Sequence, residues 1–317
     1  MKTRNGEEIS VFVCSTDGTR RKLGQDELRA VPGGIRQNIG KIITKSIKEL
    51  HVRTLYLLTS IFIKKYILAK NYDEWNELIN WLHDCSSIEV EFRGKTLSFP
   101  QGGRYIPFLI DGVFVRNQYD VSEANIKDKI IIDAGANIGT FSILCALLGA
   151  KKVYAFEPVI GSCEMIRQNA KANGFDNIEV VNKALSDTNT HSKIKLTYSG
   201  DGGASLDPEN THKAVQEVDV VTVDAFLNGE RADFIKMDVE GNEEQVLNGA
   251  KETIKKYAPI LSLSAYHRPT DKTVLPATVL GMDNKYKINL LTFDDEVFFC
   301  EVPPYKPVIN CEGCSDC

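Results

Sequence analysis

The feature that most constrains the fold of this chain is an alternation of apolar and amphipathic segments from Lys129 onward. The strand-like segments KIIIDAG, KKVYAFEP and DFIKMDVEG are each followed by a helix-like segment, namely IGTFSILCALLG, CEMIRQNAKANG and NEEQVLNGAKETIKKY. Strands that alternate with helices form a mostly parallel sheet covered on both faces. Near the end, YKINLLTFDDEVFFCEV predicts two strands around an Asp-Asp turn. The predicted fold class is therefore α/β, with an antiparallel terminal hairpin.

The rest of the 317-residue chain divides by pattern. Apolar residues recur at helical spacing between residues 35 and 84, so residues 1–85 are predicted to be a mainly helical N-terminal segment. The stretch IEVEFRGKTLSF alternates in polarity, which predicts short strands within residues 86–128, together with a linker. Residues 129–302 then form the ligand-binding domain, and residues 303–317 form a cysteine-rich tail.

Charge is distributed unevenly along the chain. Residues 1–70 contain fourteen Lys or Arg and six Asp or Glu, a net charge of +8, whereas the whole chain has a formal net charge of −5. The basic segment could bind an anionic partner such as a membrane surface, a nucleotide-sugar or a polyanionic glycan, or its helices could simply have solvated basic faces. No nucleic-acid partner is expected. The most apolar window, LYLLTSIFI, is too short for a membrane span, and the first residues lack a signal-peptide pattern, so a cytoplasmic location is expected.

The chain ends in CEGCSDC, where Cys311, Cys314 and Cys317 form two overlapping Cys-x-x-Cys units. Three thiolates at this spacing could bind zinc or an iron–sulfur cluster, with Cys300 as a fourth ligand. The alternative is a redox-sensitive tail without a metal.

The stretch DAGANIGTF, residues 133–141, joins the first predicted strand of this domain to the first helix. Its glycine spacing, with Gly135, Asn137 and Gly139, differs from the G-x-G-x-x-G of dinucleotide-binding proteins. Glycines here allow a ligand close to the backbone, and Asp133 could anchor the turn or face a positive ligand group. Glu157 ends the second strand, where a carboxylate can accept both hydroxyls of a ribose. These residues predict an adenosine-containing ligand.

The end of the strand DFIKMDVEG distinguishes between adenosine-containing ligands. It carries Asp238 and Glu240, with Glu243 and Glu244 just beyond. Such a group of carboxylates would repel the pyrophosphate of NAD, but it suits the sulfonium of S-adenosylmethionine. The pattern therefore favours S-adenosylmethionine and argues against a dehydrogenase.

Five segments carry a resemblance to a known family: IIDAGANIGTFS, VYAFEP, NKALSD, DFIKMDVEGNEEQVLNGA and YHRPTD, within residues 130–271. They resemble the FkbM-type S-adenosylmethionine-dependent methyltransferases, which act mostly on hydroxyl groups of sugars and related compounds. The resemblance implies a class I methyltransferase fold. It also places four residues around the amino-acid end of the cofactor: Asp133, Gly135, Asn137 and Gly139. Glu157 would bind the ribose, and Asp187 would either lie near the adenine or be an ordinary turn residue.

Methylation of a hydroxyl requires removal of its proton, and Asp238, Glu240 and His267 are the candidate bases. Two residues apart on a strand, Asp238 and Glu240 could instead hold a divalent metal, or one of them could cap the next helix. Asp271 could orient the imidazole of His267 or cap a helix of its own.

Two further interpretations stay open. A peptide or a lipid could replace the sugar or glycan acceptor. Alternatively, the domain could bind a nucleotide without catalysis, as an adaptor with a metal-sensitive or redox-sensitive cysteine tail.

Overall fold

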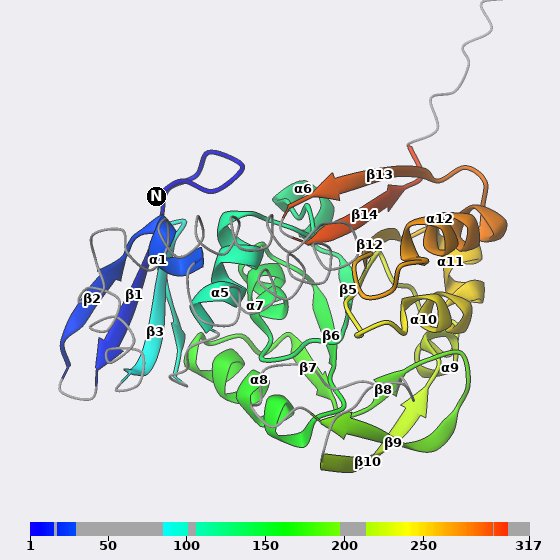
Figure 1. The fold of residues 1–317 in the computed structure, drawn as a ribbon, viewed down its shortest axis with the longest axis horizontal. Coiled ribbons are helices and arrows are strands. Elements are labelled where there is room, and N and C mark those ends of the chain that lie inside the picture. The colour runs from blue at the N-terminus through cyan, green and yellow to red at the C-terminus, as the bar shows by residue number, and fades with distance from the viewer. Residues whose placement is uncertain (16–17, 30–84, 101–105, 197–213, 294, 304–317) are drawn as a thin grey trace, which may run out of the picture.

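The computed structural model describes residues 1–15, 18–29, 85–100, 106–196, 214–293 and 295–303. Its centre is a seven-stranded sheet in the order β13-β14-β12-β11-β5-β6-β7 (Figure 1). The strands are β5 (Ile130–Ala134), β6 (Lys152–Phe156), β7 (Ile178–Val181), β11 (Phe234–Met237), β12 (Ile260–Ser264), β13 (Lys287–Thr292) and β14 (Glu296–Glu301). β14 is antiparallel to both of its neighbours, and the other paired strands are parallel. This is the strand order of a class I methyltransferase, and the predicted α/β fold with an antiparallel terminal hairpin is confirmed.

Helices pack on both faces of this sheet because successive strand residues point in opposite directions. Ile131 belongs to one buried apolar cluster with Phe141 of α7, whereas Ile132 belongs to a second cluster with Leu247 of α10. Helices α7 (Thr140–Leu147) and α8 (Ile160–Ala172) lie beside β5, β6 and β7. The remaining helices of the domain are α6 (Glu123–Ile126), α9 (Val223–Leu227), α10 (Glu243–Gly249), α11 (Lys251–Tyr257) and α12 (Asp271–Met282).

A second, three-stranded sheet has the order β8-β10-β9, with β8 (Ala184–Leu185), β9 (Thr190–Leu196) and β10 (Ala214–Val221). β9 and β10 are antiparallel neighbours. The residues between them, 197–213, lie outside the described chain.

The described residues near the N-terminus form strands, which differs from the predicted helical segment. A four-stranded sheet has the order β2-β1-β3-β4, with β1 (Ile9–Ser15), β2 (Arg20–Leu23), β3 (Cys85–Phe92) and β4 (Lys95–Phe99). A short helix, α1 (Gln25–Arg29), comes directly after β2. The sequence ISVFVCS buries alternate residues, so its period of two gives a strand. The predicted helices between residues 35 and 84, with much of the basic segment, lie outside the described residues.

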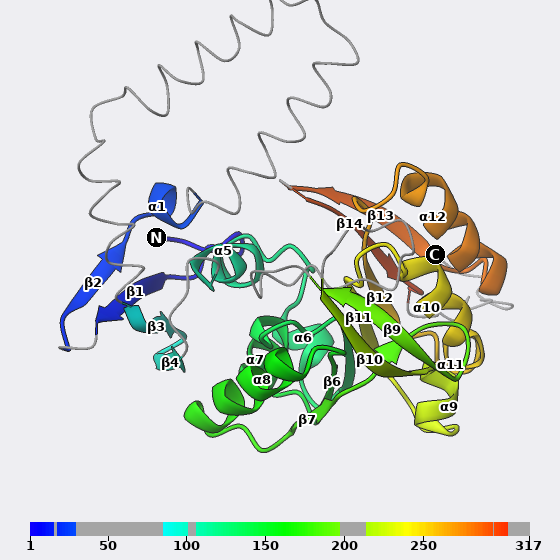
Figure 2. The same ribbon diagram turned by 60° about the horizontal axis from the view of Figure 1, so that its bottom comes forward.

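A short helical segment lies between the four-stranded sheet and the central sheet (Figures 1 and 2). It consists of α5 (Ile106–Ile110), followed by a π-helix, η2 (Asp111–Val115). Within it, Arg116 Nε lies 2.8 Å from Asp111 Oδ2, and both side chains are buried. π-Helical turns are rare and often occur at functional sites. None of the helices in the described parts of the chain has the length and apolar character of a membrane span.

Candidate active site

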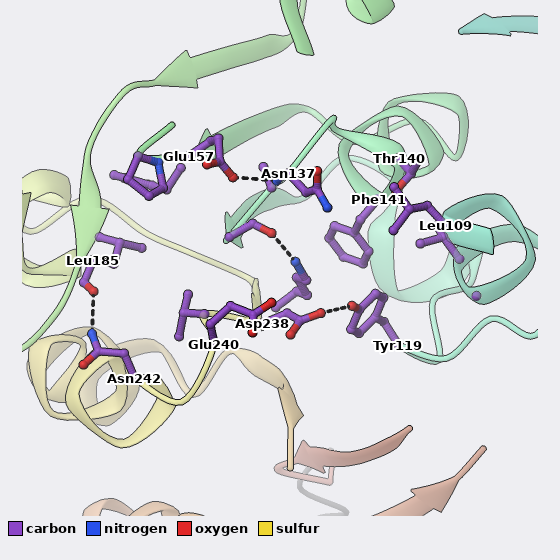
Figure 3. A pocket seen from close by; sticks show the side chains of 18 of the residues that line it. Leu109, Tyr119, Asn137, Thr140, Phe141, Glu157, Leu185, Asp238, Glu240 and Asn242 are labelled. Atoms are coloured by element: carbon purple, nitrogen blue, oxygen red, sulfur yellow. Dashed lines mark hydrogen bonds between the residues drawn. The ribbon is translucent and has the colours of Figure 1, made fainter. Parts of the chain in front are cut away.

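A pocket lies beyond the carboxyl ends of β5, β6 and β11 (Figure 3). Figure 3 shows two ends: Glu157 and Leu185 lie at one, and Leu109, Tyr119 and Phe141 lie at the other. Asp238 and Glu240 lie between them. The described lining residues are Phe108, Leu109, Gly112, Val113, Gln118, Tyr119, Gly135, Ala136, Asn137, Thr140, Phe141, Phe156, Glu157, Pro158, Lys183, Ala184, Leu185, Ile194, Lys236, Asp238, Val239, Glu240, Asn242, Tyr266 and Asp295.

The glycine turn after β5 depends on left-handed backbone conformations, with φ of 76° at Gly135 and 54° at Asn137. A Cβ atom on Gly135 would overlap the backbone oxygen of Asp238, so the ends of β5 and β11 touch at this point. Gly135 and Asn137 both line the pocket. Gly139 does not: a Cβ there would lie 3.0 Å from Ile166 Cγ2, so this glycine allows α8 to pack closely.

Asp133 is buried beneath the turn and is not among the described residues that line the pocket. Its carboxylate accepts hydrogen bonds from Ser142 Oγ at 2.7 Å and from Lys236 Nζ at 3.1 Å. The carboxylate therefore anchors the turn, which is one of its two predicted roles. Lys236 was not predicted as a site residue. The available signal was a lysine inside the otherwise apolar strand FIKM, since lysine is almost never buried without a partner.

Glu157 lies at the pocket end where a ribose is expected. Its two oxygens accept hydrogen bonds from the backbone N–H groups of Asn137, at 2.7 Å, and of Val159, at 2.9 Å. Burial raises the pKa of Glu157 to about 7, although these two hydrogen bonds act to lower it. Each carboxylate oxygen can accept a further hydrogen bond, so the group keeps capacity for two hydroxyls.

Asp187 is exposed and is not one of the described pocket residues. Lys183, Ala184 and Leu185 line the pocket in this region instead. Asn242, also unpredicted, donates from Nδ2 to the backbone oxygen of Leu185 at 3.0 Å (Figure 3). The position of Asp187 favours the alternative that it is a turn residue.

Asp238 is fixed by two phenols from distant parts of the chain. Tyr119 donates from its hydroxyl to Oδ2 at 2.7 Å, and Tyr266 donates to Oδ1 at 3.1 Å. Burial alone would raise the pKa of Asp238, but the charges of Lys236 and His267 and the two phenol hydrogen bonds hold it below its ordinary value. Asp238 is therefore an ionised carboxylate on the pocket wall.

His267 lies behind this carboxylate, and the described pocket lining does not include it. Its Nδ1 is 3.0 Å from Glu243 Oε1, whereas its Nε2 is 3.4 Å from Asp238 Oδ1 and 3.6 Å from Glu240 Oε2. Burial alone would lower the pKa of His267, but the three carboxylates raise it to about 9. The imidazole is therefore protonated at neutral pH, and this state cannot act as the predicted general base.

The same geometry bears on the predicted metal at Asp238 and Glu240. Asp238, Glu243 and His267 each offer a ligand atom within 4.8 Å of the others. The two ring nitrogens of His267 face different carboxylates: Nδ1 lies beside Glu243, and Nε2 lies beside Asp238. The imidazolium thus lies beside the carboxylates that were expected to hold a cation.

Neighbouring carboxylates stabilise the loops around His267. Glu243 accepts hydrogen bonds from the backbone N–H groups of Val239, at 2.9 Å, and Gly241, at 3.4 Å. Asp271, the first residue of α12, accepts one from the backbone N–H of Arg268 at 2.7 Å. The N-cap of α12 is Thr270, so Asp271 is the first residue of this helix and not its predicted cap.

The cysteines of the tail lie outside the described residues. Cys300, their predicted partner, is buried in β14 between β12 and β13. Burial raises the pKa of the Cys300 thiol to about 12.

Comparison with known families places residues 133–288 in the methyltransferase FkbM domain. This stretch of the chain belongs to the FkbM methyltransferase family. The matched residues contain the glycine turn, Glu157, Asp238 and His267, whereas the segment around α5 and Tyr119 precedes them.

Individual relatives of this chain match only in part. Protein arginine N-methyltransferase 1 of Oryza sativa subsp. indica is 36% identical over 89 residues, which cover 27% of this chain and 23% of the rice protein. Methyltransferase sdnD of Sordaria araneosa is 28% identical over 182 residues, covering 46% of this chain and 69% of that protein. The crystal structure of methyltransferase FkbM from Methylobacillus flagellatus KT has 24% identity and a TM-score of 0.43, and covers 54% of this chain and 43% of that one.

Proposed function

We propose that this protein is an S-adenosylmethionine-dependent methyltransferase. The observation that carries the proposal is the pocket at the ends of β5, β6 and β11, which joins the glycine turn to two differently placed carboxylates. Gly135 leaves the backbone bare where a Cβ atom would overlap the next strand, and Glu157 offers its carboxylate at the other side of the turn. When bound, the cofactor would supply an electrophilic methyl group on a sulfonium.

Glu157 would bind the ribose, and Asn137 would hold Glu157 through its backbone N–H. Asn242 fixes the backbone at Leu185, beside which the adenine would lie. The negative charges of Asp238 and Glu240 face the middle of the pocket, where they would favour a positively charged sulfur.

Asp238 would take the proton of the acceptor hydroxyl. Its lowered pKa keeps the carboxylate ionised and so able to accept a proton, and the hydroxyl becomes strongly acidic as its oxygen forms a bond to carbon. Tyr119 and Tyr266 would hold the carboxylate in place, and burial with the charge of Asp238 raises the pKa of both phenols well above the ordinary value, so both remain neutral donors. Proximity of the aligned groups would supply much of the acceleration.

His267 would act through its charge. As an imidazolium it compensates the carboxylates of Asp238, Glu240 and Glu243, and so keeps the turn after β11 folded in spite of three close negative charges.

The acceptor we propose is a hydroxyl group of a sugar or glycan. The resemblance of the glycine turn and of the strand end DFIKMDVEG to the FkbM family supports this choice. Relatives named as protein arginine and RNA methyltransferases make a peptide or an RNA the competing acceptors.

Calorimetric titration with S-adenosylhomocysteine, beside NAD, tests the cofactor assignment. Saturable binding of S-adenosylhomocysteine alone is expected. Transfer of a labelled methyl group to a panel of glycosides, peptides and RNA then tests the acceptor. Failure to bind either cofactor would refute the methyltransferase proposal and favour a non-catalytic adaptor.

A further inference from the structure

The buried ion pair under the glycine turn has a second set of contacts that directs it toward the ligand. Lys236 lies opposite Asp133 in the register of β11 with β5. Besides Asp133, its Nζ donates to the backbone oxygen of Gly135 at 2.7 Å and lies 3.4 Å from that of Ala134. The three hydrogens of the ammonium are therefore directed at one carboxylate and two carbonyl groups of the turn.

Lys236 also connects the two sides of the pocket. Its strand, β11, leads two residues later to Asp238, whose backbone oxygen touches Gly135. Its ammonium lies 5.3 Å from the centre of the Tyr119 ring and 5.9 Å from that of Phe141, both at the pocket end opposite Glu157 and Leu185. Although the side chain is nearly inaccessible, it lines the pocket.

The position of Gly135 in the pocket indicates which part of a ligand would lie against the backbone that Lys236 holds. With Glu157 assigned to the ribose and Asp238 to the point of methyl transfer, the sulfur would lie between these two residues. Gly135 lines the same pocket and meets the backbone oxygen of Asp238, so it lies beside that point. The amino-acid branch starts at that sulfur. A turn whose carbonyl groups are held by Lys236 is therefore the surface against which this branch would lie.

We propose that Lys236 is a positioning residue that shapes the subsite for the amino-acid branch of the cofactor. This inference rests on the proposed methyltransferase function. It assigns to a residue outside the predicted site the task of fixing the turn, while Glu157 independently fixes the ribose.

The test compares two ligands that differ only in this branch. S-adenosylhomocysteine has the amino-acid part, whereas 5′-methylthioadenosine lacks it but keeps the ribose and the adenine. For Lys236→Met, the affinity for S-adenosylhomocysteine should fall by about tenfold or more, and that for 5′-methylthioadenosine should stay within about threefold of wild type. Glu157→Gln is the matched control, because it should weaken both ligands alike.

Removing Lys236 alone leaves Asp133 buried without a counter-charge, which can unfold the protein. The double variant Asp133→Asn/Lys236→Met removes both charges and should show the same selective loss. An equal loss of both ligands in the folded double variant would overturn the role of Lys236. A wild-type protein that binds neither ligand would overturn the methyltransferase proposal itself, so the two failures can be told apart.

Discussion

The pKa of Glu157 gives a sharp prediction about cofactor affinity. The buried carboxyl has a pKa of about 7 in the free protein, against an ordinary value of 4.5. Ribose hydroxyls would donate hydrogen bonds to the ionised form, so binding requires or induces loss of its proton. If only the ionised form binds, the affinity for S-adenosylhomocysteine should be about tenfold lower at pH 6 than at pH 8.

The raised pKa of Glu157 also makes the stability of the folded protein depend on pH. Between pH 4.5 and 7 the folded protein keeps a proton that the unfolded chain has released, so the free energy of unfolding falls as pH rises through this window. The loss should approach about 3 kcal/mol above pH 7. Binding of S-adenosylhomocysteine should offset part of this loss in the free energy of unfolding.

Isothermal titration at several pH values between 6 and 8, in two buffers of different ionisation enthalpy, measures both affinity and proton release. Glu157→Gln should bind more weakly and with an affinity that does not change over this range. Its melting temperature should be recorded, because the amide leaves one of the two backbone donors without an acceptor. Equal pH dependence in wild type and Glu157→Gln would refute the reasoning.

Three other substitutions test the remaining parts of the site. Asp238→Asn should bind S-adenosylhomocysteine within about threefold of wild type but transfer a labelled methyl group roughly 10²- to 10⁴-fold more slowly; full turnover on an identified acceptor would exclude Asp238 as the base. The stabilisation from His267 should be complete below pH 6.5 and lost as pH rises through about 9. Measured by urea unfolding over that range, the free energy of unfolding should fall by about 3 kcal/mol more in wild type than in His267→Gln. Parallel pH profiles of the two proteins would contradict this. Gly135→Ala should abolish cofactor binding or folding because of its overlap with Asp238, whereas Gly174→Ala, with a similar φ of 69° and open space around it, should cost only about 1–2 kcal/mol in a melting experiment.

The central sheet could be predicted from the sequence because its signals are local. Ile131 and Ile132 are adjacent apolar residues that serve opposite faces, and such a run indicates a strand buried on both sides. The glycine turn and the end of β11 were likewise recognisable, since each is a short continuous motif. Gly135, Asn137 and Glu157, which were predicted from such short motifs, all line the pocket.

The parts that escaped prediction depend on contacts between distant residues. Tyr119 reaches Asp238 across 119 positions of sequence, and nothing near either residue indicates the pair. The strand β1 pairs with β3, more than seventy residues later, so its short alternation was overlooked beside the stronger helical pattern that follows. The protonation state of His267 depends on three carboxylates, two of which are the residues that were expected to act beside it.

The origin of the pocket walls has a practical consequence for re-engineering. Phe108, Leu109, Gln118 and Tyr119 come from the segment before residue 133, and Asp295 comes from after residue 288, so all five fall outside the stretch that matches the family. A chimera that exchanged only residues 133–288 would replace the glycine turn, Glu157 and Asp238 but would keep these five pocket residues. A library that randomised Phe108, Leu109 and Gln118 would instead vary this wall of the pocket. It would keep the glycine turn and Glu157, the residues proposed to bind the methyl donor, unchanged.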